Sequence, residues 1–210
     1  MSFPAPVSAT LLHLPVIRAS DLRKTAVPGS WRFQTLVGIL SELSEATPCG
    51  ALSVAADIIL EAQREREPVA WVAGPDSIFY PPDLAGRGID VSAVAVIRGD
   101  RPLDSLRCAE WLVRCGAFGL VVVDAEGEWR VSDSSLGRLQ KLAERNQCAV
   151  LFLTRKTAGE ASLGTRISRR GCVARGEPAA CSVEILTLKD TVAHRTTRER
   201  RQYRGPAGMH

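Results

Sequence analysis

Short apolar runs alternate with amphipathic stretches between residues 50 and 154, and this alternation limits the fold more than any other feature of the sequence. It predicts strands at 69–72, 93–97, 119–123 and 148–154, with helices at 50–66, 103–115 and 134–146. The run at 119–123 has no polar position, which is typical of a strand that is covered on both faces. Strict alternation of strands and helices predicts an α/β fold with a mostly parallel central sheet flanked by helices.

The pattern changes at both ends of this region. Strand-like segments at 167–175 and 181–188 have too short a connection for a helix, which predicts an antiparallel hairpin at the C-terminal edge of the sheet. Apolar residues between Trp31 and Leu43 recur at helical spacing, so we expect a helix there. Residues 1–30 contain four prolines and are expected to form an N-terminal arm.

The composition indicates a globular protein of the cytoplasm. Of the 210 residues, 45% are hydrophobic and 24% are charged, and no apolar run reaches the roughly 20 residues that cross a bilayer. No basic segment precedes the short apolar patch near the N-terminus, so a secretory signal is not expected. The six cysteines form no CxxC pair and no cluster with histidine, which predicts buried thiols in a reducing compartment and no metal site.

The excess positive charge lies at the C-terminus. The chain has a net charge of +4, and the segment 189–210 alone accounts for it, so residues 1–188 are neutral in sum. A basic tail of this kind binds nucleic acid, remains solvated, or orders on a protein partner, and the sequence leaves the three alternatives open.

Gly50 ends a loop just before a long expected helix, which is the layout of a phosphate-binding loop. A working loop continues with lysine and then serine or threonine, but Ala51 and Leu52 follow here. Asp124, directly after the apolar run at 119–123, has the place of a magnesium-binding carboxylate, although such a residue also caps loops or pairs with arginine. Because phosphoryl transfer depends on positioned charge, we expect no enzymatic activity and no cofactor.

The four tryptophans divide into two pairs. Trp71 in an expected strand and Trp111 in an expected helix are predicted to lie in the core. Trp31 and Trp129 lie in or near loops and are the better candidates for an interface.

The order of these elements resembles the core of RecA. More narrowly, FYPPDLAGRGIDVSAVAVIR (79–98) and LRCAEWLVRCGAFGLVVVDAE (106–126) resemble the ImuA family, RecA-like accessory proteins encoded with ImuB and a DnaE-type error-prone polymerase. The resemblance covers roughly residues 37–189. It implies a RecA-like core at 31–189, between the arm at 1–30 and a basic flexible tail at 190–210.

Carried over by position, the resemblance implies a degenerate nucleotide site made up of Gly50, Ala51, Leu52, Pro75, Asp124 and Arg155. Ala51 falls on the phosphate-loop lysine, Leu52 on the magnesium-binding threonine, Pro75 near the catalytic glutamate and Arg155 near the glutamine that senses nucleotide. Asp124 keeps the Walker-B aspartate. The two loops that would grip DNA fall at 125–135 and 156–167, and both look shortened.

The function that this resemblance implies is DNA-damage-induced (SOS) mutagenesis: support of translesion synthesis through binding to RecA and ImuB, and indirectly to the DnaE-type polymerase. The expected contact residues are in the tail, namely Arg195, Arg198, Arg200, Arg201, Tyr203 and Arg204. Deletion of residues 190–210 is expected to weaken partner binding and to leave the fold intact. Two alternatives remain open: a SulA-like cell-division inhibitor that acts on FtsZ, and a DNA-dependent ATPase with an atypical phosphate loop.

Overall fold

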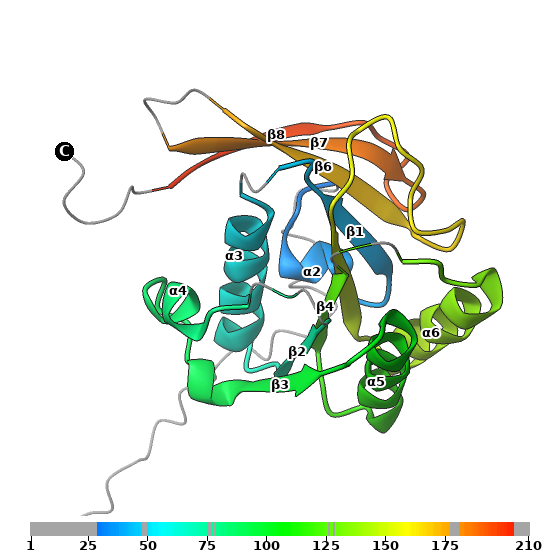
Figure 1. Cartoon of the computed structure of the whole chain (residues 1–210). Helices are drawn as coiled ribbons and strands as arrows, with labels where there is room; N and C mark the ends of the chain where they lie inside the picture. Colours follow the sequence, from blue (N-terminus) through cyan, green and yellow to red (C-terminus); the bar gives the residue numbers. More distant parts are fainter. Residues whose placement is uncertain are drawn as a thin grey trace, which may run out of the picture.

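One eight-stranded sheet organises the part of the chain that the computed structural model describes, which is residues 29–47, 50–74, 77, 79–125, 127, 129–176 and 181–203 (Figure 1). The strand order is β3-β2-β4-β5-β1-β6-β7-β8. Neighbours from β3 to β6 are parallel, and β6, β7 and β8 are antiparallel. The strands are β1 (Leu40–Ser44), β2 (Val69–Ala73), β3 (Val94–Arg98), β4 (Leu120–Ala125), β5 (Ala149–Thr154), β6 (Arg169–Arg175), β7 (Ser182–Asp190) and β8 (Arg198–Gln202). The predicted α/β class and mostly parallel sheet are therefore confirmed.

Helices cover the parallel part of the sheet on both faces (Figure 1). One face packs against α2 (Phe33–Leu36), α3 (Ala51–Arg64) and α4 (Pro81–Ala85), and the other against α5 (Pro102–Cys115) and α6 (Asp133–Asn146). A short 3₁₀ turn, η2 (Val91–Ala93), leads into β3. Side chains alternate along β2, so that Trp71 joins the core under α3 while Ala70 and Val72 join the core under α5.

The helix predicted for residues 31–43 is wrong. Only α2 is helical there, and the chain turns at Gly38, whose φ of 78° favours glycine, before it enters β1. β1 lies between β5 and β6, and all five of its residues are buried. Its polar side chains hid the strand in the sequence, but they are hydrogen bonded: Ser41 donates to the Val150 carbonyl and Ser44 to the Gly171 carbonyl.

The basic tail expected at 190–210 is also corrected where the structure describes it. Residues 198–202 form β8, which pairs antiparallel with β7 from Ser182↔Gln202 to Leu186↔Arg198. The predicted antiparallel hairpin of β6 and β7 is present, and β8 extends it to the edge of the sheet (Figure 1).

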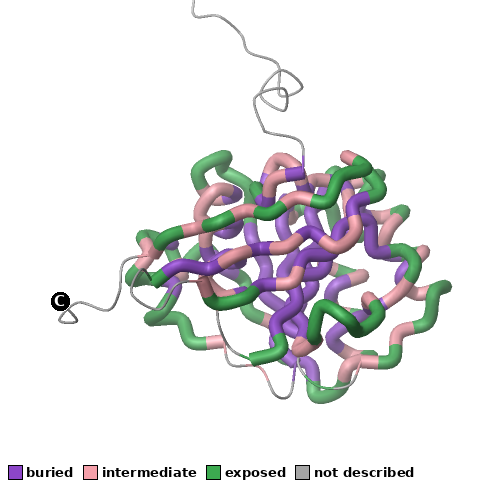
Figure 2. Tube along the Cα trace, turned by 90° about the horizontal axis from the view of Figure 1, so that it is seen from above, coloured by how far each residue is buried: buried purple, intermediate pink, exposed green. Residues whose placement is uncertain are grey.

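Buried residues run through the middle of the molecule and exposed residues line its periphery, as the view from above shows (Figure 2). None of the helices in the described ranges combines the length and the apolar character that a membrane crossing requires. Of the arm predicted at 1–30, only Gly29 and Ser30 are among the described residues, and Pro75 and Arg204 lie outside them.

Candidate functional site

The start of α3 lies at the carboxyl edge of the parallel strands, where open α/β sheets bind ligands. Gly50 precedes the first residue of this helix with a φ of 149°, a backbone conformation that side chains disfavour. A Cβ atom on Gly50 would lie 2.3 Å from Cγ1 of Val183 in β7. Close packing of β7 against this turn therefore explains the glycine without a phosphate.

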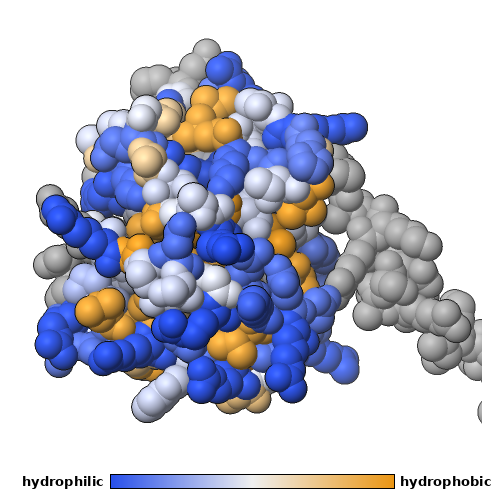
Figure 3. Space-filling view, turned by 90° about the vertical axis from the view of Figure 1, so that its right-hand side faces the viewer, coloured by the Kyte–Doolittle hydropathy of each residue, from blue (hydrophilic) through white to orange (hydrophobic). Residues whose placement is uncertain are grey.

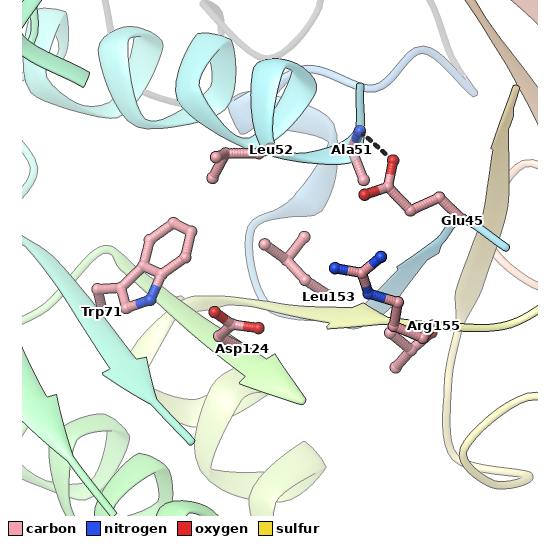
Figure 4. A pocket seen from close by; sticks show the side chains of 8 residues that line it. Glu45, Ala51, Leu52, Trp71, Asp124, Leu153 and Arg155 are labelled. Atoms are coloured by element: carbon pink, nitrogen blue, oxygen red, sulfur yellow. Dashed lines mark hydrogen bonds between the residues drawn. The ribbon is translucent and has the colours of Figure 1, made fainter. Parts of the chain in front are cut away.

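A carboxylate of the chain itself occupies the amino end of α3 (Figure 4). Oε2 of Glu45 accepts hydrogen bonds from the backbone N–H of Gly50 at 3.0 Å and of Ala51 at 2.9 Å. The first N–H groups of a helix have no partner within the helix and favour an anion, which is how many proteins bind phosphate. Glu45 therefore takes the place that a phosphate group would need.

Glu45 is held there by its own backbone. It directly follows β1, its N–H donates to the Thr154 carbonyl of β5 at 3.1 Å, and its carbonyl accepts from the Lys156 N–H at 3.1 Å. The residue is buried. The carboxylate is thus presented to α3 by the two central strands of the sheet.

The space beneath α3 is a cavity of about 20 Å³. A volume of this size holds about one water molecule, whereas ligand pockets for small molecules measure roughly 300–1,000 Å³. The cavity is lined by Glu45, Ala51, Leu52, Trp71, Asp124, Leu153, Thr154 and Arg155 (Figure 4). The structure thus brings together most of the residues predicted for a degenerate nucleotide site, and the cavity among these described residues has about the size of one water molecule.

Asp124 belongs to β4 and pairs with Ala73 of β2 and Leu153 of β5. Its carboxylate is buried and accepts a hydrogen bond of 2.5 Å from the Ser77 hydroxyl. This contact supports the structural interpretation of Asp124, in which the carboxylate holds a loop.

Trp71 fills the space next to Asp124 (Figure 4). Its ring packs against Phe79 with centroids 4.8 Å apart, and its indole N–H has no acceptor among the described residues. The prediction that Trp71 lies in the core is confirmed.

The other tryptophan predictions are corrected where the structure contradicts them. Trp31, expected at an interface, is fully buried, and its Nε1 donates to the Thr187 hydroxyl at 3.1 Å. Trp129 is partly buried against the core under α5 and α6. Trp111, expected in the core, is exposed, because it lies on the side of α5 that faces away from the sheet.

The second loop predicted to grip DNA, 156–167, is tied to the core. Glu42 of β1 is fully buried, and its carboxylate accepts hydrogen bonds from the Thr154 hydroxyl and the Leu163 N–H, and pairs with Lys156 Nζ at 3.2 Å. Arg170 donates to the Thr157 and Glu160 carbonyls from beneath the same loop. These contacts fix the loop to β1 and β6. The first predicted loop, 125–135, includes residues outside the described ranges.

The basic C-terminal strand has an inner and an outer side. On the inner side, Arg201 Nη1 and the Tyr203 hydroxyl both donate to Oδ2 of Asp57 in α3 at 2.9 Å, and burial raises the pKa of the Tyr203 hydroxyl. The Arg87 guanidinium lies 4.6 Å from the centroid of the Tyr203 ring. Arg201 and Tyr203, predicted as partner-binding residues, therefore attach β8 to α3.

On the outer side, Arg198, Arg200 and Gln202 are exposed, and Arg195 is exposed just before the strand. Because side chains alternate along a strand, the three β8 residues lie on one face. Among the described residues of the predicted contact set, Arg195, Arg198 and Arg200 are the ones presented to solvent.

Three carboxylates of the candidate site were not predicted from the sequence. Glu45 binds the start of α3, Glu42 anchors the loop 156–167, and Asp57 anchors β8. A buried acidic residue within β1 has no distinctive pattern in a sequence, and the position of Asp57 on the outer side of α3 is typical of a solvated residue. Glu45 had one usable signal: a carboxylate a few residues before the first helical N–H groups, as in a capping interaction.

Comparisons with known proteins agree with this fold. No model of a protein family matches the chain. The chain is 30% identical over 113 residues to Protein RecA of Chlorobium chlorochromatii, which covers 50% of this chain and 32% of that protein. It is 31% identical over 132 residues to Protein RecA of Corynebacterium jeikeium (58% and 35%) and 27% identical over 116 residues to that of Fusobacterium nucleatum (51% and 30%).

The fold and the sequence similarity define the class: a RecA-like α/β core, in which the Glu45 carboxylate accepts hydrogen bonds from the first N–H groups of α3. The relationship to RecA is distant, and the chain spans about a third of the length of the curated relatives that it matches.

Proposed function

We propose that this protein is a non-catalytic, RecA-like accessory protein of the ImuA type, which acts in the cytoplasm in DNA-damage-induced (SOS) mutagenesis. In this proposal it supports error-prone translesion synthesis by binding RecA and ImuB, and through ImuB it serves the DnaE-type polymerase. The distant similarity to RecA and the resemblance of residues 79–98 and 106–126 to the ImuA family support the proposal.

The observation that carries the non-catalytic part is the contact of Glu45 with the start of α3. A triphosphate that approached these N–H groups would have to displace a buried carboxylate, and the two anions would repel each other. Ala51 and Leu52 supply neither the cation nor the hydroxyl that would offset this repulsion. A cavity for about one water molecule supports the same proposal.

The partner-binding part is supported by the outer side of β8. Arg198 and Arg200 point away from α3, while Glu199 and Arg201 point inward and hold the strand in place. A basic strand that is already ordered loses little conformational entropy when a partner binds. We therefore assign the partner contact to the exposed arginines at 195, 198 and 200.

The experiment that tests this proposal is a binding measurement of the full chain with purified RecA and with purified ImuB. The double variant Arg198→Glu, Arg200→Glu is expected to weaken binding to at least one partner by about tenfold or more, because charge pairs at interfaces contribute about 1.5 kcal/mol or more. The matched control is Lys141→Glu, Arg145→Glu, which reverses two exposed charges on α6 and is expected to bind as the wild type does.

Two results would count against the proposal at different levels. Equal binding by all variants would remove the assignment to β8 while leaving the partners in place. If the wild-type chain bound neither RecA nor ImuB, or bound FtsZ and blocked its assembly, the accessory role itself would fail.

A further inference from the structure

α5 presents to solvent a face that the fold does not use. Trp111 is 72% exposed and Leu103 is 58% exposed, the largest exposed fractions among the large hydrophobic residues in the helices and strands that the structure describes. The side of α5 that faces the sheet is formed by Leu106, Ala109 and Val113. With 3.6 residues per turn, the opposite side carries what we name the Trp111 face, which consists of Leu103, Arg107, Trp111 and Arg114.

Positive charge surrounds this apolar pair. Four guanidinium groups that are 57–77% exposed, those of Arg101, Arg107, Arg114 and Arg138, lie on the Trp111 face or beside it. Their carboxylate partners lie deeper: Asp104 is 29% exposed and Glu110 is 13% exposed.

The ion pairs also fix the positions of the arginines. Arg101 and Arg107 pair with Asp104 at 2.9 and 3.7 Å. Arg114 and Arg138 pair with Glu110 at 2.8 and 3.4 Å. The arginine side chains of this face are therefore more exposed than the carboxylates with which they pair.

We propose that the Trp111 face docks an acidic segment of a partner protein that carries an apolar side chain. Trp111 and Leu103 bury the apolar side chain, and Arg107 and Arg114 pair with the carboxylates on either side of it. Tryptophan and arginine are the residue types that most often dominate the binding energy of protein interfaces, and a tryptophan ring buries about 150–250 Å².

The chemistry of the face favours a protein over a nucleic acid. Single-stranded nucleic acid binds to several aromatic rings on which successive bases stack, and this face offers one ring. Leu103, which is exposed on the same face, offers contact to an apolar side chain of a protein.

The Trp111 face is separate from the basic strand β8. In Figure 1, α5 lies at the opposite end of the molecule from β8. Figure 3 shows the side that carries α5 and α6, where small hydrophobic patches lie among hydrophilic side chains. The inference is therefore independent of the partners proposed for β8, and the two surfaces can be tested one at a time.

The test follows the indole N–H signals of the full chain by NMR while a synthetic peptide is added. The probe is a twelve-residue peptide of aspartate and glutamate with one central phenylalanine, at up to millimolar concentration, since short peptides bind weakly. The Trp111 signal is assigned by its loss in Trp111→Phe. The buried Trp31 indole, which donates to Thr187, serves as the internal reference.

We expect a saturable shift of the Trp111 signal and no shift of the Trp31 signal. Arg107→Glu should weaken binding about fivefold, whereas Arg145→Glu, an exposed arginine on α6, should bind as the wild type does.

Three results would overturn the inference: no Trp111 shift with the probe, an equal shift with a peptide that has serine in place of the phenylalanine, or tighter binding of a thymidine oligonucleotide. The last result would assign the face to nucleic acid instead.

Discussion

Glu45 and Ala51 together determine whether the start of α3 can bind an anion. Ala51 supplies no positive charge where a phosphate-binding loop has its lysine, and Glu45 places a negative charge at the first N–H groups of α3. The two differences act in the same direction. A site that only lacked its lysine would still offer an anion the start of α3, whereas a site that holds its own carboxylate does not.

The first prediction concerns the stability of this contact. Glu45→Ala leaves the N–H groups of Gly50 and Ala51 without their charged acceptor, so we expect a loss of about 1.5–3 kcal/mol in the free energy of unfolding. Glu45→Gln keeps one oxygen acceptor of the same length and should lose less than half as much. Chemical denaturation measures both. Equal losses would contradict this prediction, because they would show that the neutral oxygen of glutamine does not maintain the contact.

The second prediction concerns the buried ion pair between Arg169 and Asp190, whose Nε and Oδ2 atoms are 2.9 Å apart. Asp190→Ala leaves the Arg169 charge buried without its partner, which is expected to cost about 3–5 kcal/mol. The control is Asp104→Ala, which removes the partner of two exposed arginines and should cost about 1 kcal/mol or less. Similar losses in the two variants would contradict the structural role of the buried pair.

The third prediction concerns the reactivity of cysteine. Burial raises the pKa of the Cys148 thiol to about 12, so the thiol stays protonated at neutral pH and ionises only as the pH rises toward that value. Cys115 is exposed. Iodoacetamide at about pH 8 should therefore modify Cys115 and leave Cys148 unmodified in the folded protein, as peptide mass spectrometry would detect. Modification of both at the same rate would show that the β5 end of the core opens readily.

At the scale of elements, β1 shows where sequence patterns mislead. The residues around it have a helical spacing of apolar positions, and its sequence LSELS has no β-branched residue. The strand exists because the sheet supplies partners for its polar side chains: the Glu42 carboxylate alone contacts Thr154, Lys156 and Leu163. Such contacts depend on residues more than 100 positions away, so a local pattern does not predict them.

β8 was missed for a related reason. Charged residues occupy both faces of β8: Arg198 and Arg200 are exposed on one side, and Glu199 and Arg201 lie on the other. Because neither face is apolar, the segment resembles a solvated tail in the sequence. Asp57 of α3 and the N–H of Trp31 give the inward residues their partners. These contacts lead us to expect that removal of β8 destabilises the fold, in contrast to the expectation from the sequence that deletion of residues 190–210 leaves the fold intact.

The fourth prediction tests this correction. A chain that ends at Thr197 loses the contact of Glu199 with the Trp31 N–H and that of Arg201 with Asp57, so we expect a loss of at least about 3 kcal/mol. Hydrogen exchange of residues 31–36 should become faster in the same chain.

The control for the fourth prediction is Arg198→Ala, which changes an exposed residue on the outer side of β8. It should stay within about 0.5 kcal/mol of the wild type. A truncated chain as stable as the wild type would restore the interpretation of this segment as a tail.

At the scale of the whole molecule, the alternation of elements was sufficient to predict β2, β3, β4 and β5 of the sheet, because each apolar run is too short for a helix and each amphipathic stretch too long for a strand. The missing lysine and hydroxyl at Ala51 and Leu52 predict a degenerate nucleotide site, and this stays a prediction. The contact of Glu45 with α3 was not predicted, because it depends on the geometry of β1, β5 and α3 together, although a carboxylate a few residues before a helix was a usable signal.

Trp111 was predicted to lie in the core, but it is exposed. A helix pattern shows which side is apolar, and Trp111 was counted with that side because tryptophan is usually buried. The structure turns it outward, opposite the face that Val113 and Ala109 present to the sheet. The two surfaces proposed as partner contacts, the outer side of β8 and the Trp111 face, are therefore separate.

We propose that the RecA-like core does not bind a nucleotide, and calorimetric titration of the full chain with magnesium and ATP tests this proposal. Asp124→Asn is the matched variant, and RecA is the positive control. We expect no saturable heat up to millimolar ATP with either form of the chain, because Glu45 occupies the start of α3 and the cavity beneath it measures about 20 Å³. Saturable, magnesium-dependent binding by the wild type that disappears in Asp124→Asn would contradict the account.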